Sequence, residues 1–259
     1  MLALKVNAKT TMTMHEVTYE HAGINYADCF FYPESFDKPV PAVLINPDYH
    51  GLTSYAKAEA KWLSEIGLVG YCVDIYGEKG MPRTSQDAAE KVIPLFNNRA
   101  AVLNRLSIAL EHACSLEGVD ASRSGVIGFS SGGLFALDMA RRIKSIQAVA
   151  SVWGVFLPWE LKPSAMIEPS VDGASLLFIH GTDDVFNPMD SNMNLIRELD
   201  QAGTDYQLIL LGGKKHAFSL KTSDNLEVLS GEEPQALLYD EAADLRARQY
   251  VKYFLSEAL

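Results

Sequence analysis

The sequence has few cysteines and no long apolar run, and each shortage excludes a class of protein. Three cysteines occur in 259 residues. They are odd in number and lack metal-ligand spacing, so neither a disulfide framework nor a metal site is expected. No apolar stretch is long enough to cross a bilayer, and residues 1–9 contain a Lys but no apolar core of a signal peptide. We therefore expect a cytoplasmic protein without a membrane anchor.

Basic residues are also scarce relative to acidic ones. The 22 Lys and Arg stand against 33 Asp and Glu, which gives a formal net charge of -11 at pH 7. Such a charge repels phosphate backbones and anionic lipid surfaces, so neither nucleic acid nor a membrane is an expected partner. The expected partner is a small molecule, and a homodimer is left open.

No internal repeat and no Pro-, Ser- or Gly-rich tract divides the chain, so residues 1–259 are expected to form a single domain. Apolar runs instead alternate with helical patterns along the sequence. The runs that resemble buried strands are residues 42–46, 69–74, 124–129, 148–153, 176–180 and 207–211.

Helical patterns lie between these runs. Apolar side chains recur at intervals of three and four over residues 103–113, 196–199 and 250–255. Pro94 is expected to end or kink a helix that begins near Ser85, and a second helix is expected to start around Phe96. The alternation predicts an α/β fold with a mostly parallel central sheet and helices on both faces. Residues 5–32 are expected to add antiparallel strands at one edge.

One motif predicts a nucleophile. Residues 126–133 read Val-Ile-Gly-Phe-Ser-Ser-Gly-Gly, so an apolar strand runs into Gly-x-Ser-x-Gly and then into the helical stretch 134–143. This pattern is typical of a nucleophile elbow, in which a sharp turn lifts Ser130 above the sheet. The N–H of Ser131 would face a developing oxyanion from the start of the helix. Alternatively, Gly128 and Gly132 merely serve a tight turn beneath a helix.

An acid and a base follow two later strands. The run 176–180 leads into a turn with two carboxylates, of which we favour Asp184 as the acid and Asp183 as a turn cap. A solvated turn residue is the alternative for either. His216 follows the run 207–211 and is the expected base, which completes the chain order Ser, Asp, His. His50 is the alternative base, although it precedes Ser130 in the chain.

The segment that contains His50 has a second expected role. Residues 46–51 read Asn-Pro-Asp-Tyr-His-Gly and follow an apolar strand, where this arrangement places another oxyanion donor. The backbone N–H of Tyr49 or that of His50 is expected to supply it.

Four residues are candidates for contacts with the substrate. Trp153, Phe156 and Trp159 follow the strand after the elbow, where they either form the wall of an acyl or alcohol site or belong to the core. Arg83 lies in an expected loop and either binds a substrate carboxylate or is a surface residue without a partner.

Taken in this order, the segments resemble the dienelactone hydrolase family of the α/β-hydrolase fold, from about Pro39 to the C-terminus. The resemblance rests on residues 41–45, 49–52, 74–77, the elbow, 180–184, 216–218 and 239–244. It implies that Ser130, Asp184 and His216 match the family's nucleophile, acid and base. Dienelactone hydrolases proper carry Cys in the elbow and a Glu where this chain has Asp48, so a carboxylic ester is a safer substrate class than dienelactone.

The expected function is therefore that of a serine hydrolase that cleaves a carboxylic ester or lactone through an acyl-enzyme intermediate. This chemistry needs no cofactor. Two alternatives remain open, namely an acyltransferase or peptidase with the same triad, and a non-catalytic ligand-binding module of the same fold. The sequence does not separate them, because the triad is shared and specificity depends on loops.

Overall fold

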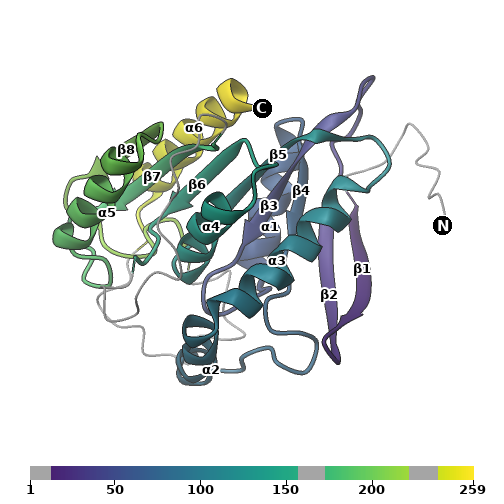
Figure 1. The fold of residues 1–259 in the computed structure, drawn as a ribbon, viewed down its shortest axis with the longest axis horizontal. Coiled ribbons are helices and arrows are strands. Elements are labelled where there is room, and N and C mark those ends of the chain that lie inside the picture. The colour runs from purple at the N-terminus through teal and green to yellow at the C-terminus, as the bar shows by residue number, and fades with distance from the viewer. Residues whose placement is uncertain (1–12, 157–172, 222–238) are drawn as a thin grey trace.

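The computed structural model describes residues 13–156, 173–221 and 239–259, and its strands form one sheet (Figure 1). The strand order is β1-β2-β4-β3-β5-β6-β7-β8. Strands β3 to β8 are mutually parallel, whereas β1 and β2 form an antiparallel hairpin that pairs antiparallel with β4 at one edge. The strands are β1 Met14–His21, β2 Ile24–Phe31, β3 Val40–Asn46, β4 Val69–Cys72, β5 Val119–Phe129, β6 Ala148–Val152, β7 Ser175–Gly181 and β8 Tyr206–Leu211.

The central strands bury both of their faces. In β3, Ala42 and Leu44 belong to one apolar cluster and Val43 and Ile45 to another on the opposite side of the sheet. A strand covered on both faces needs apolar residues at every position, which is why it appears as a continuous apolar run rather than as an alternation. The predicted mostly parallel α/β fold with helices on both faces is confirmed.

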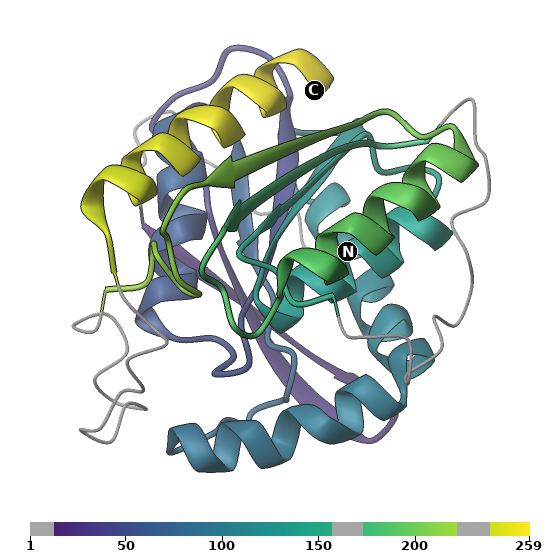
Figure 2. The same cartoon turned by 90° about the vertical axis from the view of Figure 1, so that its left-hand side faces the viewer.

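The helices form two layers around the sheet. Helices α1 and α6 contribute to the apolar cluster on one face, and α3, α4 and α5 contribute to the cluster on the other (Figure 2). Among the described residues, no helix has the length and apolar character required to span a bilayer. The helices are α1 Ser54–Glu65, α2 Ser85–Asn97, α3 Arg99–Cys114, α4 Ser131–Arg142, α5 Met189–Ala202 and α6 Glu241–Ala258.

The prediction that Pro94 either ends or kinks its helix fails for the first alternative, and the next helix begins at Arg99 rather than around Phe96. Helix α2 begins at Ser85 as expected, but it continues through Pro94 to Asn97. Pro94 lies on the exposed side of the helix, so the carbonyl that loses its N–H partner can bind water instead. The break falls at Asn98, whose side chain accepts a hydrogen bond from the Ala101 N–H and caps α3.

The edge hairpin is joined to the core by a buried ion pair. Arg105 of α3 pairs with Asp28 of β2, and both side chains are almost fully buried. Asp28 also accepts hydrogen bonds from the hydroxyls of Tyr19 (2.6 Å) and Tyr71 (2.9 Å) and from the N–H of Asp74 (2.8 Å). Burial and the Asp28 carboxylate raise the pKa of Tyr71, so its hydroxyl stays a donor. This buried charge is therefore fully paired.

Candidate active site

The turn between β5 and α4 holds Ser130 in a backbone conformation that few residues adopt. Its φ is 51° and its ψ is -119°, a conformation that costs on the order of 1–3 kcal/mol for a residue other than glycine. Glycine is required on both sides. A Cβ on Gly128 would lie 2.1 Å from the carbonyl oxygen of Gly132, and a Cβ on Gly132 would lie 2.2 Å from that of Asn46. The Gly-x-Ser-x-Gly spacing is thus imposed by the close packing of β5, α4 and the end of β3.

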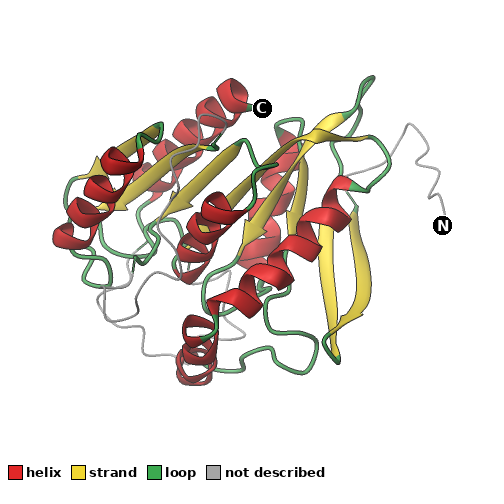
Figure 3. Cartoon of the chain, in the orientation of Figure 1, coloured by secondary structure: helices red, strands yellow, loops and turns green. Residues whose placement is uncertain are grey.

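Three side chains form one hydrogen-bonded chain at the carboxyl edge of the sheet. Ser130 Oγ lies 2.9 Å from Nε2 of His216, and Nδ1 of His216 lies 2.8 Å from Oδ2 of Asp184. Ser130 follows β5, Asp184 follows β7 and His216 follows β8. Figure 3 shows in green the loops that join the strands and helices. With its proton on Nδ1, the imidazole donates to the carboxylate and accepts from the hydroxyl. This arrangement can draw a proton from the Ser130 hydroxyl and stabilise the resulting imidazolium.

Both oxygens of Asp184 have partners. Its Oδ1 accepts hydrogen bonds from the backbone N–H groups of Phe186 (2.9 Å) and Asn187 (3.1 Å), while Oδ2 faces the imidazole. The side chain is 3% exposed. Asp183, by contrast, is exposed, and its Oδ1 accepts a hydrogen bond from the hydroxyl of its neighbour Thr182. Asp184 rather than Asp183 is therefore the acid that the structure brings to His216.

The sequence model of the dienelactone hydrolase family matches residues 29–259. The chain belongs to this family. A Bradyrhizobium protein described as a probable 2-oxo-3-(5-oxofuran-2-ylidene)propanoate lactonase is 29% identical over 189 residues, which cover 69% of this chain and 73% of that protein.

Two solved structures show the same fold across nearly the whole chain. The protein m3DLH superposes with a TM-score of 0.84 at 22% identity and covers 95% of this chain and 98% of its own. A dienelactone hydrolase-like promiscuous phosphotriesterase from metagenomic libraries superposes with a TM-score of 0.80 at 23% identity, with the same coverage of 95% and 98%. At these identities the likeness concerns the fold.

In this dienelactone hydrolase family member, aromatic rings flank the imidazole of His216 on two sides. The Trp153 ring lies 5.2 Å away at an interplanar angle of 80°, and the Phe186 ring lies 5.0 Å away at 54°. Trp153 is 1% exposed, whereas Phe186 is 47% exposed. The imidazole of His216 therefore contacts one buried aromatic ring and one that is partly exposed to solvent.

A second histidine lies close to this pair but is buried without a hydrogen bond. His180, in β7, is fully buried, and neither ring nitrogen has a hydrogen-bond partner among the described residues. Burial lowers the pKa of His180 to about 4, with the nearby Asp184 opposing that shift. His180 is therefore neutral near pH 7, so it adds no positive charge beside an imidazolium at His216.

The structure separates the two donors proposed in the loop after β3. The N–H of His50 donates to Oδ1 of Asp48 at 2.7 Å, and its Nδ1 lies 3.0 Å from the same oxygen. His50 is thus held within its own loop, and the histidine at hydrogen-bond distance from Ser130 is His216. Tyr49, the other predicted donor, accepts a hydrogen bond at its carbonyl from the hydroxyl of Tyr76 at 2.7 Å, and its role as a donor stays a prediction. Ser131, the other candidate, is the first residue of α4, where N–H groups have no partner within the helix.

Among the described residues, burial bears on three of the four predicted substrate-contacting side chains. Trp153 is buried behind His216, and Phe156 is 7% exposed and packs against Phe178 and His180. Their burial favours the interpretation that both are core residues. Trp159 lies outside the described residues. Arg83 is exposed, and its backbone N–H bonds to Asp87, which favours the interpretation of a surface residue.

Several residues at the site were not predicted from the sequence. Phe186 and Asn187 fix the acid through their backbone, and Ser219 accepts a hydrogen bond from Trp153. The position of the first two, directly after the acid, is a signal that could have been used, because a turn carboxylate often accepts from N–H groups two and three residues later. For Ser219 the sequence holds no comparable signal.

Proposed function

We propose that this chain is a serine hydrolase that cleaves a carboxylic ester or lactone through an acyl-enzyme intermediate. The observation that carries the proposal is the continuous chain from Ser130 Oγ to His216 (2.9 Å) and on to Asp184 (2.8 Å). A Ser hydroxyl is a weak nucleophile on its own, and a neighbouring imidazole oriented by a carboxylate is the arrangement that activates it. Membership of a hydrolase family supports the same class of activity.

Acylation begins when His216 Nε2 accepts the proton of Ser130 as Oγ attacks the acyl carbon. The carbonyl oxygen becomes an oxyanion. We assign the backbone N–H groups of Ser131 and Tyr49 to stabilise it, at about 3 kcal/mol each. Collapse of the tetrahedral intermediate breaks the bond to the alcohol oxygen, which takes the proton from His216. An ester loses its alcohol at this step, whereas the alcohol of a lactone stays attached to the acyl group.

Deacylation repeats these steps with water. His216 accepts a proton from water, the hydroxide attacks the acyl carbon, and the same donors stabilise the second oxyanion. The bond to Ser130 Oγ then breaks and Oγ recovers its proton from the imidazolium. Asp184 stays ionised throughout, because its role is to hold the Nδ1–H tautomer and to stabilise the charge on the ring.

The surroundings of His216 favour a substrate with an apolar group. Val185 is 68% exposed and Phe186 is 47% exposed, and the Phe186 ring lies against the imidazole. The exposed Phe186 ring beside the imidazole, with the exposed Val185 next to it in the chain, offers an apolar surface to an alkyl or aryl group of the ester. The family relative described as a lactonase supports including cyclic esters.

The proposal is tested with p-nitrophenyl esters. Wild type should release a burst of p-nitrophenol, and Ser130→Ala should abolish the burst and lower kcat by at least about 10³-fold. Ser107→Ala serves as a matched control, because the Ser107 hydroxyl donates to the carbonyl of Leu103 in its own helix α3. Equal activity of wild type and Ser130→Ala would refute the proposal.

The same panel separates the alternatives. Faster turnover of p-nitroanilides than of esters would indicate a peptidase, and acyl transfer to an added alcohol in preference to water would indicate an acyltransferase. A binding module would not react with a fluorophosphonate probe, whereas the proposed hydrolase should be labelled at Ser130.

A further inference from the structure

Behind His216, on the side of the sheet that carries α1 and α6, one buried hydroxyl links two aromatic side chains. Ser219 Oγ accepts a hydrogen bond from Nε1 of Trp153 at 2.7 Å and lies 2.8 Å from the hydroxyl of Tyr55. An indole N–H can only donate, so the direction of the first bond is certain. All three residues are buried. The link is therefore shielded from water and is sensitive to the loss of any partner.

These buried side chains also contact the candidate base and the residue next to the candidate nucleophile. The Trp153 ring meets the His216 imidazole edge to face at 5.2 Å. Phe129, which directly precedes Ser130, lies 5.5 Å from the Trp153 ring and 5.3 Å from the Tyr55 ring. We call Tyr55, Phe129, Trp153 and Ser219 the aromatic brace. It touches the candidate base and the residue next to the candidate nucleophile.

Trp153 is held in a strained backbone conformation. Its φ is 40°, in the left-handed region, which a bulky residue rarely adopts. Two hydrogen bonds hold it there, one from its backbone N–H to the carbonyl of Ile179 (2.8 Å) and one from its indole to Ser219. Strain of this kind persists only where the surroundings enforce it, and it marks a side chain whose direction matters.

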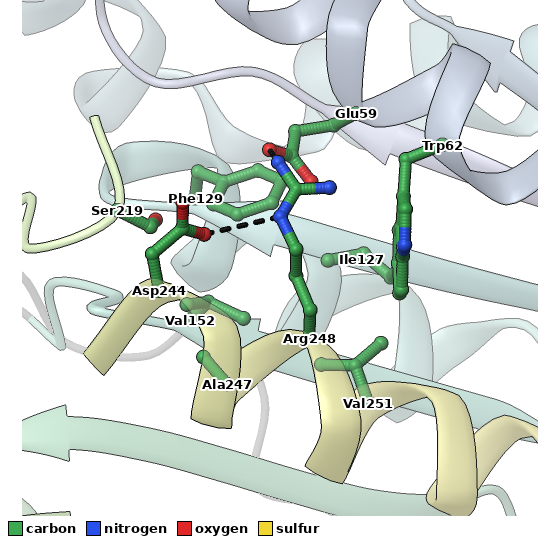
Figure 4. A pocket seen from close by; sticks show the side chains of 10 residues that line it. All are labelled: Glu59, Trp62, Ile127, Phe129, Val152, Ser219, Asp244, Ala247, Arg248 and Val251. Atoms are coloured by element: carbon green, nitrogen blue, oxygen red, sulfur yellow. Dashed lines mark hydrogen bonds and ion pairs between the residues drawn. The ribbon is translucent and has the colours of Figure 1, made fainter. Parts of the chain in front are cut away.

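The aromatic brace borders a small cavity, so it is not closely packed on every side. Ser219 and Phe129 line a small cavity between α1 and α6, with a volume of about 20 Å³, which is enough for about one water molecule. Figure 4 shows both side chains at this cavity, where Arg248 pairs with Glu59 and Asp244. Because both carboxylates face that guanidinium, the cavity offers no unpaired cation to an anionic ligand. The hydrogen bonds of Ser219 therefore add to the packing that fixes the direction of the Trp153 ring.

We propose that Ser219 and Trp153 are positioning residues, which hold the His216 imidazole in line with Ser130. This inference rests on the proposed function. The hydrogen bond to Asp184 fixes Nδ1 of the His216 ring. It leaves the ring free to tilt about the line from Nδ1 to the carboxylate oxygen. The buried Trp153 ring, packed against the imidazole at 5.2 Å, restricts this tilt, and the more exposed Phe186 ring constrains it less. Loss of the brace should therefore slow the chemical step and leave substrate binding unchanged.

The test uses Ser219→Ala in the full-length protein. With a p-nitrophenyl ester we expect kcat to fall between about 10- and 100-fold and KM to stay within about twofold, with a matching loss in the rate of fluorophosphonate labelling. Tyr71→Phe is the control, because it removes a buried hydroxyl from Asp28, remote from the site. It should lower stability without changing kcat. Tyr55→Phe, a milder change, should lower kcat by about threefold.

A double variant tests whether Ser219 acts through Trp153. If it does, Trp153→Phe and the double variant Trp153→Phe/Ser219→Ala should have the same kcat, because the second change then removes a partner that is already lost. The proposal would be overturned if the kcat reductions of the two single variants multiplied in the double variant. It would also be overturned if the kcat of Ser219→Ala stayed within about twofold of wild type. If wild type shows no labelling at Ser130, the proposed function fails instead. Normal labelling with an unaffected Ser219→Ala would refute the brace alone.

Discussion

Replacing Asp184 by Asn changes one atom of the side chain and should reverse the direction of a hydrogen bond. The two backbone N–H groups of Phe186 and Asn187 face Oδ1 of the carboxylate at 2.9 and 3.1 Å. In Asp184→Asn the amide oxygen must occupy that side, since an NH₂ group there would face two donors. The amide NH₂ then faces Nδ1 of His216, across the present distance of 2.8 Å.

The reversed bond forces the wrong tautomer on the imidazole. Nδ1 must become an acceptor, so the ring proton moves to Nε2 and points at Ser130, which can no longer give up its proton to that nitrogen. The loss expected for such a tautomer exchange is about 10⁴-fold in kcat, or about 5 kcal/mol of transition-state stabilisation. The backbone bonds and the side-chain volume are retained, so the free energy of unfolding should change by less than about 1 kcal/mol.

The assay is kcat with a p-nitrophenyl ester, together with urea unfolding of the same preparation. Asp183→Asn is the matched control, because the neighbouring carboxylate is exposed and should be replaceable without loss of activity. The reasoning is refuted if Asp184→Asn retains kcat within about 10-fold of wild type while it is folded. Loss of activity in Asp183→Asn instead would show that the acid is misassigned.

Three further predictions concern stability. Gly128→Ala should cost about 3–5 kcal/mol in urea unfolding, because its Cβ would lie 2.1 Å from a carbonyl oxygen of α4, whereas Gly212→Ala, with no atom within 4 Å of its Cβ, should be tolerated. Arg105→Met should cost about 3–5 kcal/mol by leaving the buried Asp28 unpaired, and Arg105→Met/Asp28→Asn should cost less than Arg105→Met. Burial lowers the pKa of His180 from 6.5 to about 4, so the unfolded state binds this proton more readily. The resulting stability is full above about pH 6.5 and falls by about 3 kcal/mol as the pH approaches 4, a dependence that His180→Leu should lack.

Each of these predictions has a contradicting outcome. Equal unfolding free energies for Gly128→Ala and Gly212→Ala would show that the elbow can relax around a methyl group. An Arg105→Met protein within about 1 kcal/mol of wild type would show that water reaches Asp28. Identical pH profiles of unfolding for wild type and His180→Leu would show that His180 titrates normally in the folded protein.

The fold was largely predictable because burial on both faces leaves a strong local signal. The predicted runs 124–129 and 176–180 match the buried parts of β5 and β7. The signal fails where structure continues without burial. Strand β5 begins at Val119, ahead of the apolar run, because Val119 pairs with Val40 of β3 where the strand is not yet buried. Helix α2 likewise passes through an exposed Pro94, which propensity alone would place at its end.

The site was predictable to the extent that it depends on turns next to strands. Ser130, with glycines two positions before and after it, could be named because that turn needs those glycines. Trp153 could not be assigned, since an aromatic residue after a strand reads the same whether it lines a substrate site or packs behind a base. Its role depends on Ser219, which lies 66 positions away.

The sequence by itself determined where the central strands lie, and where the Gly-x-Ser-x-Gly turn and the candidate acid and base fall along the chain. These features follow from steric and hydrophobic constraints between residues close in the chain. Only the tertiary structure decided between Asp183 and Asp184, placed His216 rather than His50 beside Ser130, and put Trp153 behind the base. Those choices depend on distances between separate loops, which are set when the strands align and their carboxyl ends meet.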